Sequence, residues 1–194
     1  MSTSSAKKTP LDGYSKIVFI GNPGVGKTSL IRRILDQDIL SAYSPTLWVR
    51  YHNLDVQQNE TQYYLQLWDV SGNEIYSDII PSILKGASVV ILVFDYKDDK
   101  SQNEFIRLYT KVLESVSPTQ LLLVGNKFEN IKKEVPKVLS SWIKEHNLMI
   151  NPVSAKENTG KSLLLRNIIK LITDIPNSNK TTPIEVRIGT PDSE

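Results

Sequence analysis

The sequence of 194 residues contains no cysteine, so it forms no disulfide framework and carries no thiol chemistry. It also lacks an apolar run of the roughly 20 residues that a membrane-spanning helix needs, and no secretory signal peptide is visible. The formal net charge is +2 without a long basic run, which gives no indication of nucleic-acid binding. These absences are typical of a cytosolic protein, and the length of 194 residues predicts one domain with tails.

The most informative positive feature is the segment GNPGVGKT at residues 21–28, which matches the phosphate-loop pattern G-x-x-x-x-G-K-[ST]. Gly24 and Gly26 allow successive backbone N–H groups to point into one concavity that suits an anion. Lys27 places a positive charge against the β- and γ-phosphates of a nucleotide, and Thr28 offers a hydroxyl to a magnesium ion. This phosphate loop therefore predicts nucleotide binding.

Extended and helical patterns alternate along the chain, and the phosphate loop falls between the first strand and the first helix. Strands are predicted over residues 16–21, 47–57, 61–69, 88–95, 119–126 and 148–153, and helices over 27–36, 101–116, 134–146 and 160–173. The turn 57–60 joins two strands as a hairpin, whereas the other crossovers are helical. This predicts an α/β fold whose mostly parallel sheet has helices on both faces. Residues 1–13 and 175–194 are predicted to be flexible tails around a domain at 14–174.

Four further segments follow the phosphate loop in order. They are Tyr43-Ser44-Pro45-Thr46, Trp68-Asp69-Val70-Ser71-Gly72-Asn73-Glu74, Asn126-Lys127-Phe128-Glu129 and Ser154-Ala155-Lys156. Together with the phosphate loop they resemble the Ras superfamily of small GTPases over residues 14–174. Residues 65–69 and 72–87 are similar to the Rab branch, whereas 47–51 depart from it, so the chain looks like a divergent Rab-like member. The resemblance implies a P-loop NTPase G domain with a six-stranded sheet.

The resemblance also implies roles for individual residues, with GTP or GDP as the ligand. Mg²⁺ would be held by Thr28, Thr46 and Asp69. The catalytic residues would be Lys27, Thr46, Gly72 and Asn73. The nucleotide-binding residues would be Gly24, Val25, Gly26, Lys27, Thr28, Ser29, Tyr43, Thr46, Gly72, Asn126, Lys127, Glu129, Ser154, Ala155 and Lys156. Effector and regulator proteins would contact a surface formed by Tyr51, Trp68 and Ile83.

Three residues depart from the family pattern. Asn73 stands where the family glutamine orients the attacking water, and its shorter side chain predicts slow hydrolysis, since a displacement of about 1 Å can cost on the order of a hundredfold in rate. Glu129 replaces the aspartate that reads guanine, and its extra methylene predicts guanine binding about ten- to a hundredfold weaker. Pro23 has no N–H, so the phosphate cradle must come from the residues after it.

We expect no direct lipid anchor on this chain. Without cysteine the chain cannot be prenylated as Rab proteins are, and Ser2 in place of glycine excludes N-myristoylation. We therefore expect a cytoplasmic protein, one that is recruited to membranes through a partner, or a fragment of a longer chain.

Two other functions remain open from the sequence. One is a pseudo-GTPase that serves as a scaffold, which Asn73 and Glu129 favour, and the other is an NTPase for a base other than guanine. Two tryptophans are also open to two interpretations. Trp68 is either a core residue or an effector contact, and Trp48 is either a packing residue or an exposed effector contact. The arginine pair at 32–33 is interpreted as solvated helix charge.

Overall fold

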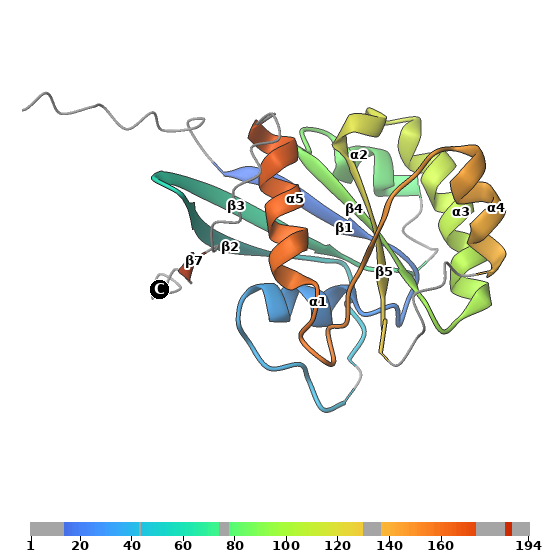
Figure 1. Ribbon diagram of the computed structural model, residues 1–194, viewed down its shortest axis with the longest axis horizontal. Coiled ribbons are helices and arrows are strands. Elements are labelled where there is room, and N and C mark those ends of the chain that lie inside the picture. Colours follow the sequence, from blue (N-terminus) through green and yellow to red (C-terminus); the bar gives the residue numbers. More distant parts are fainter. Residues whose placement is uncertain (1–13, 43, 74–77, 130–136, 174–184, 188–194) are drawn as a thin grey trace, which may run out of the picture.

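One twisted sheet runs through the molecule, with helices packed on both of its faces (Figure 1). The computed structural model describes residues 14–42, 44–73, 78–129, 137–173 and 185–187. The strands are β1 (Ser15–Ile20), β2 (Val49–Gln58), β3 (Thr61–Val70), β4 (Val89–Asp95), β5 (Leu121–Asn126), β6 (Ile150–Pro152) and β7 (Glu185–Arg187). The helices are α1 (Lys27–Ile34), α2 (Ile80–Leu84), α3 (Asp99–Leu113), α4 (Lys137–Glu145) and α5 (Lys161–Thr173), with a short 3-10 turn at Pro118–Gln120.

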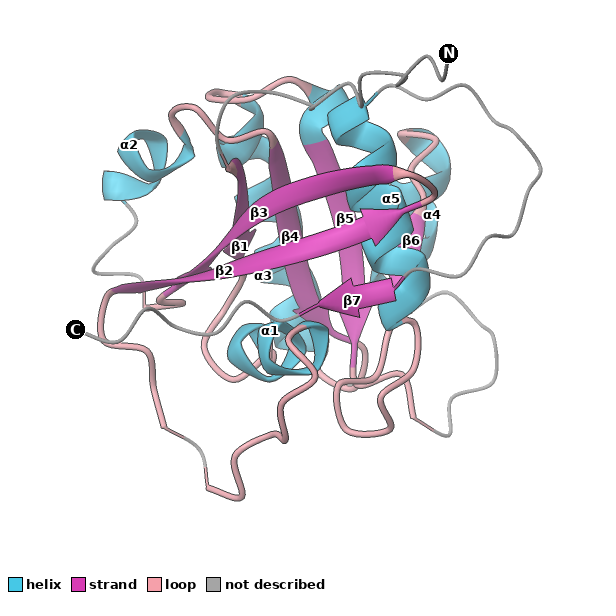
Figure 2. Cartoon of the chain, turned by 90° about the vertical axis from the view of Figure 1, so that its left-hand side faces the viewer, coloured by secondary structure: helices cyan, strands magenta, loops and turns pink. Residues whose placement is uncertain are grey.

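The strands lie in the order β6-β5-β4-β1-β3-β2-β7. β2 and β3 pair antiparallel as the two arms of the predicted hairpin. β3, β1, β4, β5 and β6 pair in parallel, because the connections between them include helices. The predicted fold class and its six strands are thus confirmed. The additional strand β7 lies in the segment predicted to be a tail, and it pairs antiparallel with residues 55–57 at the outer edge of β2 (Figure 2).

Two apolar cores lie on opposite faces of the sheet, and β1 contributes alternate residues to each. Ile17 and Phe19 belong to the core with residues of α1 and α5, whereas Val18 and Ile20 belong to the core with residues of α2, α3 and α4. Successive side chains of a strand point to opposite faces, and β4 is buried at every position because both of its faces are covered. In the part of the chain that the structure describes, no helix has the length and apolar character needed to span a membrane.

The helix α2 is not indicated by the sequence patterns. It contains five residues, which are too few to show a helical period. Pro81 lies in its first turn, where the missing N–H is tolerated. Its apolar residues pack against the sheet, and Ile83 is only 9% exposed. Ile83 therefore lies in the core rather than on the open effector surface that the family resemblance implied.

The carboxyl ends of the parallel strands meet at one edge of the sheet, and each continues into a predicted motif. β1 leads into the phosphate loop, and β3 ends next to residues 71–73. β5 leads into residues 127–129, and β6 leads into residues 153–156. Because ligands of open α/β sheets bind at this edge, the topology brings the motifs to one site.

Candidate nucleotide-binding site

A cavity of about 680 Å³ lies at this edge of the sheet. Its size is within the range of small-molecule sites, which is roughly 300–1,000 Å³. It is lined by residues of all the predicted motifs, namely Gly24, Gly26, Lys27, Thr28, Ser29, Thr46, Gly72, Asn73, Asn126, Lys127, Glu129, Ala155 and Lys156. Val25 and Ser154 are buried and do not line the cavity. Tyr43 lies outside the described residues.

The phosphate loop needs glycine where its backbone turns. Gly24 and Gly26 have φ values of 77° and 92°, in the left-handed region that favours glycine. A Cβ atom on Gly26 would also lie 2.4 Å from Nδ2 of Asn126. Because Gly26 is the N-cap of α1, the helix begins at Lys27 and directs its positive dipole end at the cavity. Backbone and helix together make this end of the cavity an anion site.

Lys27 is the positive charge inside the phosphate loop. Its side chain is only 6% exposed, and Nζ donates to the carbonyl oxygens of Gly21, at 2.7 Å, and Asn22, at 2.9 Å. Burial lowers the pKa of Lys27 to about 8, although the nearby Asp69 carboxylate works in the opposite direction. A phosphate would supply the anion that this buried ammonium lacks.

Thr28, Thr46 and Asp69 meet at a cluster of oxygen atoms. Oδ2 of Asp69 accepts from Oγ1 of Thr28 at 2.6 Å and from Oγ1 of Thr46 at 3.2 Å, and the two hydroxyls lie 3.2 Å apart. Asp69 is fully buried, and its Oδ1 has no hydrogen-bond partner among the described residues. Mg²⁺ prefers oxygen ligands and is commonly held by one or two protein groups together with phosphates. The three residues therefore fit a magnesium ion.

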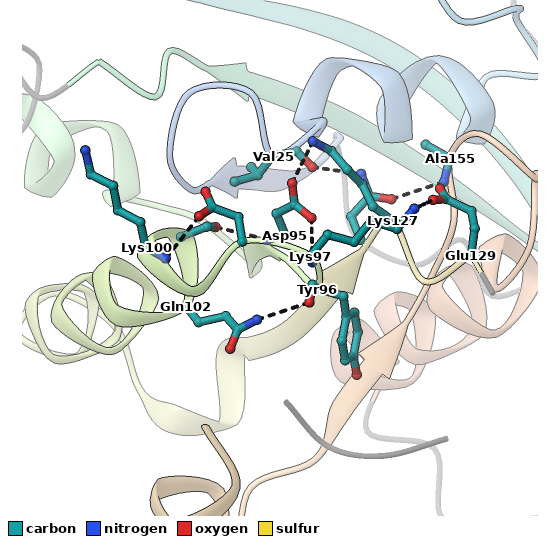
Figure 3. A network of polar contacts seen from close by, with 12 residues as sticks. Val25, Asp95, Tyr96, Lys97, Lys100, Gln102, Lys127, Glu129 and Ala155 are labelled. Atoms are coloured by element: carbon teal, nitrogen blue, oxygen red, sulfur yellow. Dashed lines mark hydrogen bonds and ion pairs between the residues drawn. The ribbon is translucent and has the colours of Figure 1, made fainter. Parts of the chain in front are cut away.

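Asn126 ties the phosphate loop to the loop after β6. Its Nδ2 donates to the carbonyl oxygen of Val25 at 2.8 Å, and its Oδ1 accepts from the backbone N–H of Ala155 at 3.1 Å. The neighbouring Lys127 forms an ion pair with Asp95 at 2.7 Å. These contacts hold three loops in one arrangement (Figure 3).

Glu129 is a buried carboxylate at the other end of the cavity, and it is 8% exposed. Its Oε1 accepts from Oγ of Ser154 at 2.8 Å, and its Oε2 forms an ion pair with Nζ of Lys97. Burial favours the neutral acid, but the hydrogen bonds from Lys97 and Ser154 and the charges of Lys97 and Lys156 outweigh it, so the pKa of Glu129 is lowered. The group is therefore an ionised acceptor at neutral pH.

Gly72 and Asn73 reach the phosphate end of the cavity from β3. A Cβ atom on Gly72 would lie 2.4 Å from the backbone nitrogen of Pro23, so the absence of a side chain lets the two loops touch. The side chain of Asn73 is exposed, and its backbone N–H donates to Oγ of Ser71 at 3.4 Å. The last residue of this motif, Glu74, lies outside the described residues.

An aromatic surface lies on the β2–β3 hairpin. Tyr51 is 64% exposed, and its ring centroid is 6.3 Å from that of the half-buried Trp68. Nζ of Lys16 lies 3.9 Å from the centroid of the Trp68 ring. Trp48 is 56% exposed, so it is a surface residue. Two residues of the predicted effector surface, Tyr51 and Trp68, are thus side by side.

Two contacts of the site lie outside the sequence-based predictions. Nε of Arg33 donates to the carbonyl oxygen of Ala155 at 2.9 Å, so this arginine links α1 to the loop after β6 and is more than a solvated charge. Lys97 binds Glu129 from the loop after β4. Both residues are basic side chains outside any motif, and only the folded arrangement shows their partners.

The fold and the site together define a P-loop nucleotide-binding domain. Residues 16–174 match the family model described as the Ras family. The chain is 34% identical to the Ras-related protein Rab-1C of Dictyostelium discoideum over 175 residues, which cover 89% of this chain and 84% of that protein. It is 30% identical over 182 residues to the Ras-related protein SEC4 of Saccharomyces cerevisiae, with 93% and 85% covered. This chain therefore belongs to the Ras family of small GTP-binding proteins and is Rab-like.

A third relative is much longer than this chain. The EF-hand calcium-binding domain-containing protein 4B of Homo sapiens is 36% identical over 158 residues, and the match covers 79% of this chain. The matched region is 22% of the length of that human protein. The similarity therefore concerns one part of the larger protein.

Proposed function

We propose that this protein is a Rab-like molecular switch that binds GTP and GDP with Mg²⁺, hydrolyses GTP slowly and acts by binding effector proteins. The observation that carries the proposal is the convergence of Thr28, Thr46 and Asp69 within 3.2 Å beside the buried Lys27. Thr46 belongs to a segment without helix or strand between α1 and β2. A metal contact made through such a segment can couple the bound phosphate to the shape of the surface.

The proposed hydrolysis depends on positioning and on charge. When bound, Mg²⁺ would neutralise charge on the β- and γ-phosphates. Lys27 would add a fixed charge at the same phosphates, and Gly72 would offer its backbone N–H to the γ-phosphate. Asn73 would orient the attacking water through its side-chain amide, at a shorter reach than glutamine.

The base end of the site favours guanine over adenine. The carboxylate of Glu129 is an acceptor, and guanine presents a ring N–H and an exocyclic amine as donors on the edge that would face it. Adenine presents neither donor on that edge, so an ionised carboxylate would repel it. Asn126, Lys127, Ala155 and Lys156 would form the rest of the base pocket.

A fluorescent-nucleotide titration tests this function directly. We expect saturable binding of GTP and GDP that weakens when Mg²⁺ is removed by a chelator, because Thr28, Thr46 and Asp69 then lose the ion that links them to the phosphates. ATP should not compete. Binding that is equally strong for ATP and GTP would overturn the proposed guanine preference.

Replacing Asn73 by glutamine should accelerate hydrolysis. The longer amide restores the reach of the family glutamine, and we expect a single-turnover rate about tenfold higher, which corresponds to about 1.4 kcal/mol of barrier. Quench-flow measurement of phosphate release from preloaded GTP gives the rate, with Asn73→Ala as the matched variant that lacks an amide. An unchanged or lower rate in Asn73→Gln would show that another feature limits hydrolysis.

Nucleotide affinity should fall as the pH rises above about 8. The pKa of Lys27 is lowered to about 8 in the free protein, and bound phosphate would favour its charged form. Binding below this pH needs no proton, whereas binding above it requires proton uptake and weakens by up to about tenfold per pH unit. Calorimetric titration of GDP in buffers of different ionisation enthalpy measures affinity and proton uptake together. Constant affinity across this range without proton uptake would contradict the assignment.

A further inference from the structure

We infer that Lys97 is a specificity-determining residue that positions Glu129 for guanine. The inference rests on the proposed function, since it concerns how the same pocket reads its base. Lys97 lines the cavity together with Glu129, and its ammonium forms an ion pair with Oε2 of that carboxylate. Figure 3 shows the two side chains pointing toward each other from different loops.

The loop that carries Lys97 is held in place by hydrogen bonds. Oδ1 of Asp95 accepts from the backbone N–H of Lys97 at 2.9 Å, and Nε2 of Gln102 donates to the carbonyl oxygen of Tyr96 at 3.1 Å. The backbone N–H of Tyr96 donates to the carbonyl oxygen of Asn126 at 3.0 Å, which ties this loop to the base-binding motif. The backbone at Lys97 is therefore held in place beside the pocket.

The carboxylate of Glu129 needs such a partner because its side chain is long. A glutamate has one more rotatable bond than an aspartate, so its carboxylate has to be oriented before it can accept two hydrogen bonds from one base edge. Lys97 holds one oxygen and Ser154 holds the other. Each carboxylate oxygen can accept more than one hydrogen bond, so both oxygens retain acceptor capacity for the ring N–H and the exocyclic amine of guanine.

Lys97 also favours the ionised form of the carboxylate. The charged groups that act on Glu129 are Lys97, from the loop after β4, and Lys156, from the loop after β6. Lys127, from the loop after β5, is paired with Asp95. Without Lys97, only Ser154 and Lys156 would oppose the effect of burial, so the pKa of Glu129 would be higher than in the unmodified protein. Guanine binding would then be lost at a higher pH on acidification.

A double-mutant cycle tests this role. The variants are Lys97→Met, Glu129→Asp and the two combined, and Lys100→Met is the matched control, because this exposed lysine lies near Lys97 and outside the cavity lining. The affinities for GDP and for IDP are measured by competition against fluorescent GDP. IDP lacks the exocyclic amine, so the ratio of the two affinities reports the second hydrogen bond to the carboxylate.

We expect Lys97→Met to weaken GDP binding about tenfold, as for the loss of one well-oriented charged hydrogen bond. The preference for GDP over IDP should fall as well. In the Glu129→Asp background the same substitution should change GDP binding by less than about twofold, because the shorter carboxylate no longer depends on Lys97. Lys100→Met should leave both affinities unchanged.

Three results would overturn the inference. The first is that Lys97→Met leaves GDP binding unchanged or tightens it, which would make Lys97 a bystander or a competitor of the base. The second is an equal loss for GDP and IDP, which indicates a general effect on the fold. The third is that Lys97→Met causes an equal loss of GDP affinity in the unmodified protein and in the Glu129→Asp variant. Failure of the unmodified protein to bind GDP at all would instead overturn the proposed function.

Discussion

Lys27→Ala should abolish measurable nucleotide binding, which is the largest effect expected of any single substitution in this protein. Nζ of Lys27 is buried and is held by two carbonyl oxygens of the phosphate loop, so it lies within the concavity that would receive the β- and γ-phosphates. Removal of a charged group that contacts phosphate in a dry site costs several charged hydrogen bonds at once, each worth about 1.5–3 kcal/mol. Titration with fluorescent GDP and GTP measures the loss.

The matched control for this prediction is Lys144→Ala, because this lysine is exposed on α4, away from the cavity. It should bind both nucleotides like the unmodified protein. Thermal unfolding in the absence of nucleotide separates lost binding from lost folding, since Lys27→Ala removes an unpaired buried charge and should leave the fold intact. Unchanged affinity in a folded Lys27→Ala variant would refute the assignment of the phosphate loop.

Glu129→Ala should weaken the binding of guanine nucleotides about a hundredfold or more, which is the second largest effect that we expect. The substitution removes an ionised acceptor for two guanine donors, and two charged hydrogen bonds at about 1.5–3 kcal/mol each correspond to at least that factor. It also leaves the ammonium of Lys97 beside the pocket without its carboxylate. Competition titration with GDP, XDP and ADP shows whether the loss is specific to guanine.

Related variants sharpen this test. Glu129→Gln replaces one of the two acceptor oxygens by an NH₂ donor and should improve binding of XDP, whose base has an oxygen in place of the exocyclic amine. Glu157→Ala is the matched control, because this exposed glutamate follows Ser154 in the next loop and lies outside the cavity lining. If Glu129→Ala retains full guanine selectivity, another group of the pocket reads the base.

The arrangement of the phosphate-loop end of the cavity was predictable from the sequence because it depends on backbone conformation. Gly24 and Gly26 adopt positive φ values, and that requirement leaves a visible pattern in the sequence. Asp69 lies near the carboxyl end of β3, and Thr28 lies in the first turn of α1 after the phosphate loop, so both are at the edge of the sheet where ligands bind. The hairpin, the parallel sheet and the four longer helices were likewise predictable, because each contains enough residues to show its period.

The other end of the cavity, around Glu129, was less predictable because its contacts join residues far apart in the chain. Lys97 and Glu129 are 32 positions apart, and Arg33 and Ala155 are 122 positions apart. For a lysine or arginine outside a motif, the sequence does not indicate which residue it contacts in the fold. The burial of Ile83 also escaped prediction, because α2 is too short for its apolar face to be recognised.

The most direct test of the central claim is to identify the nucleotide that the protein carries. The purified protein is denatured, and the released small molecules are separated by chromatography and quantified against the protein. We predict GDP or GTP at close to one molecule per chain, and none from Lys27→Ala prepared in parallel. Release of an adenine nucleotide, or of no nucleotide from a protein that also fails to bind added GDP, would contradict the account.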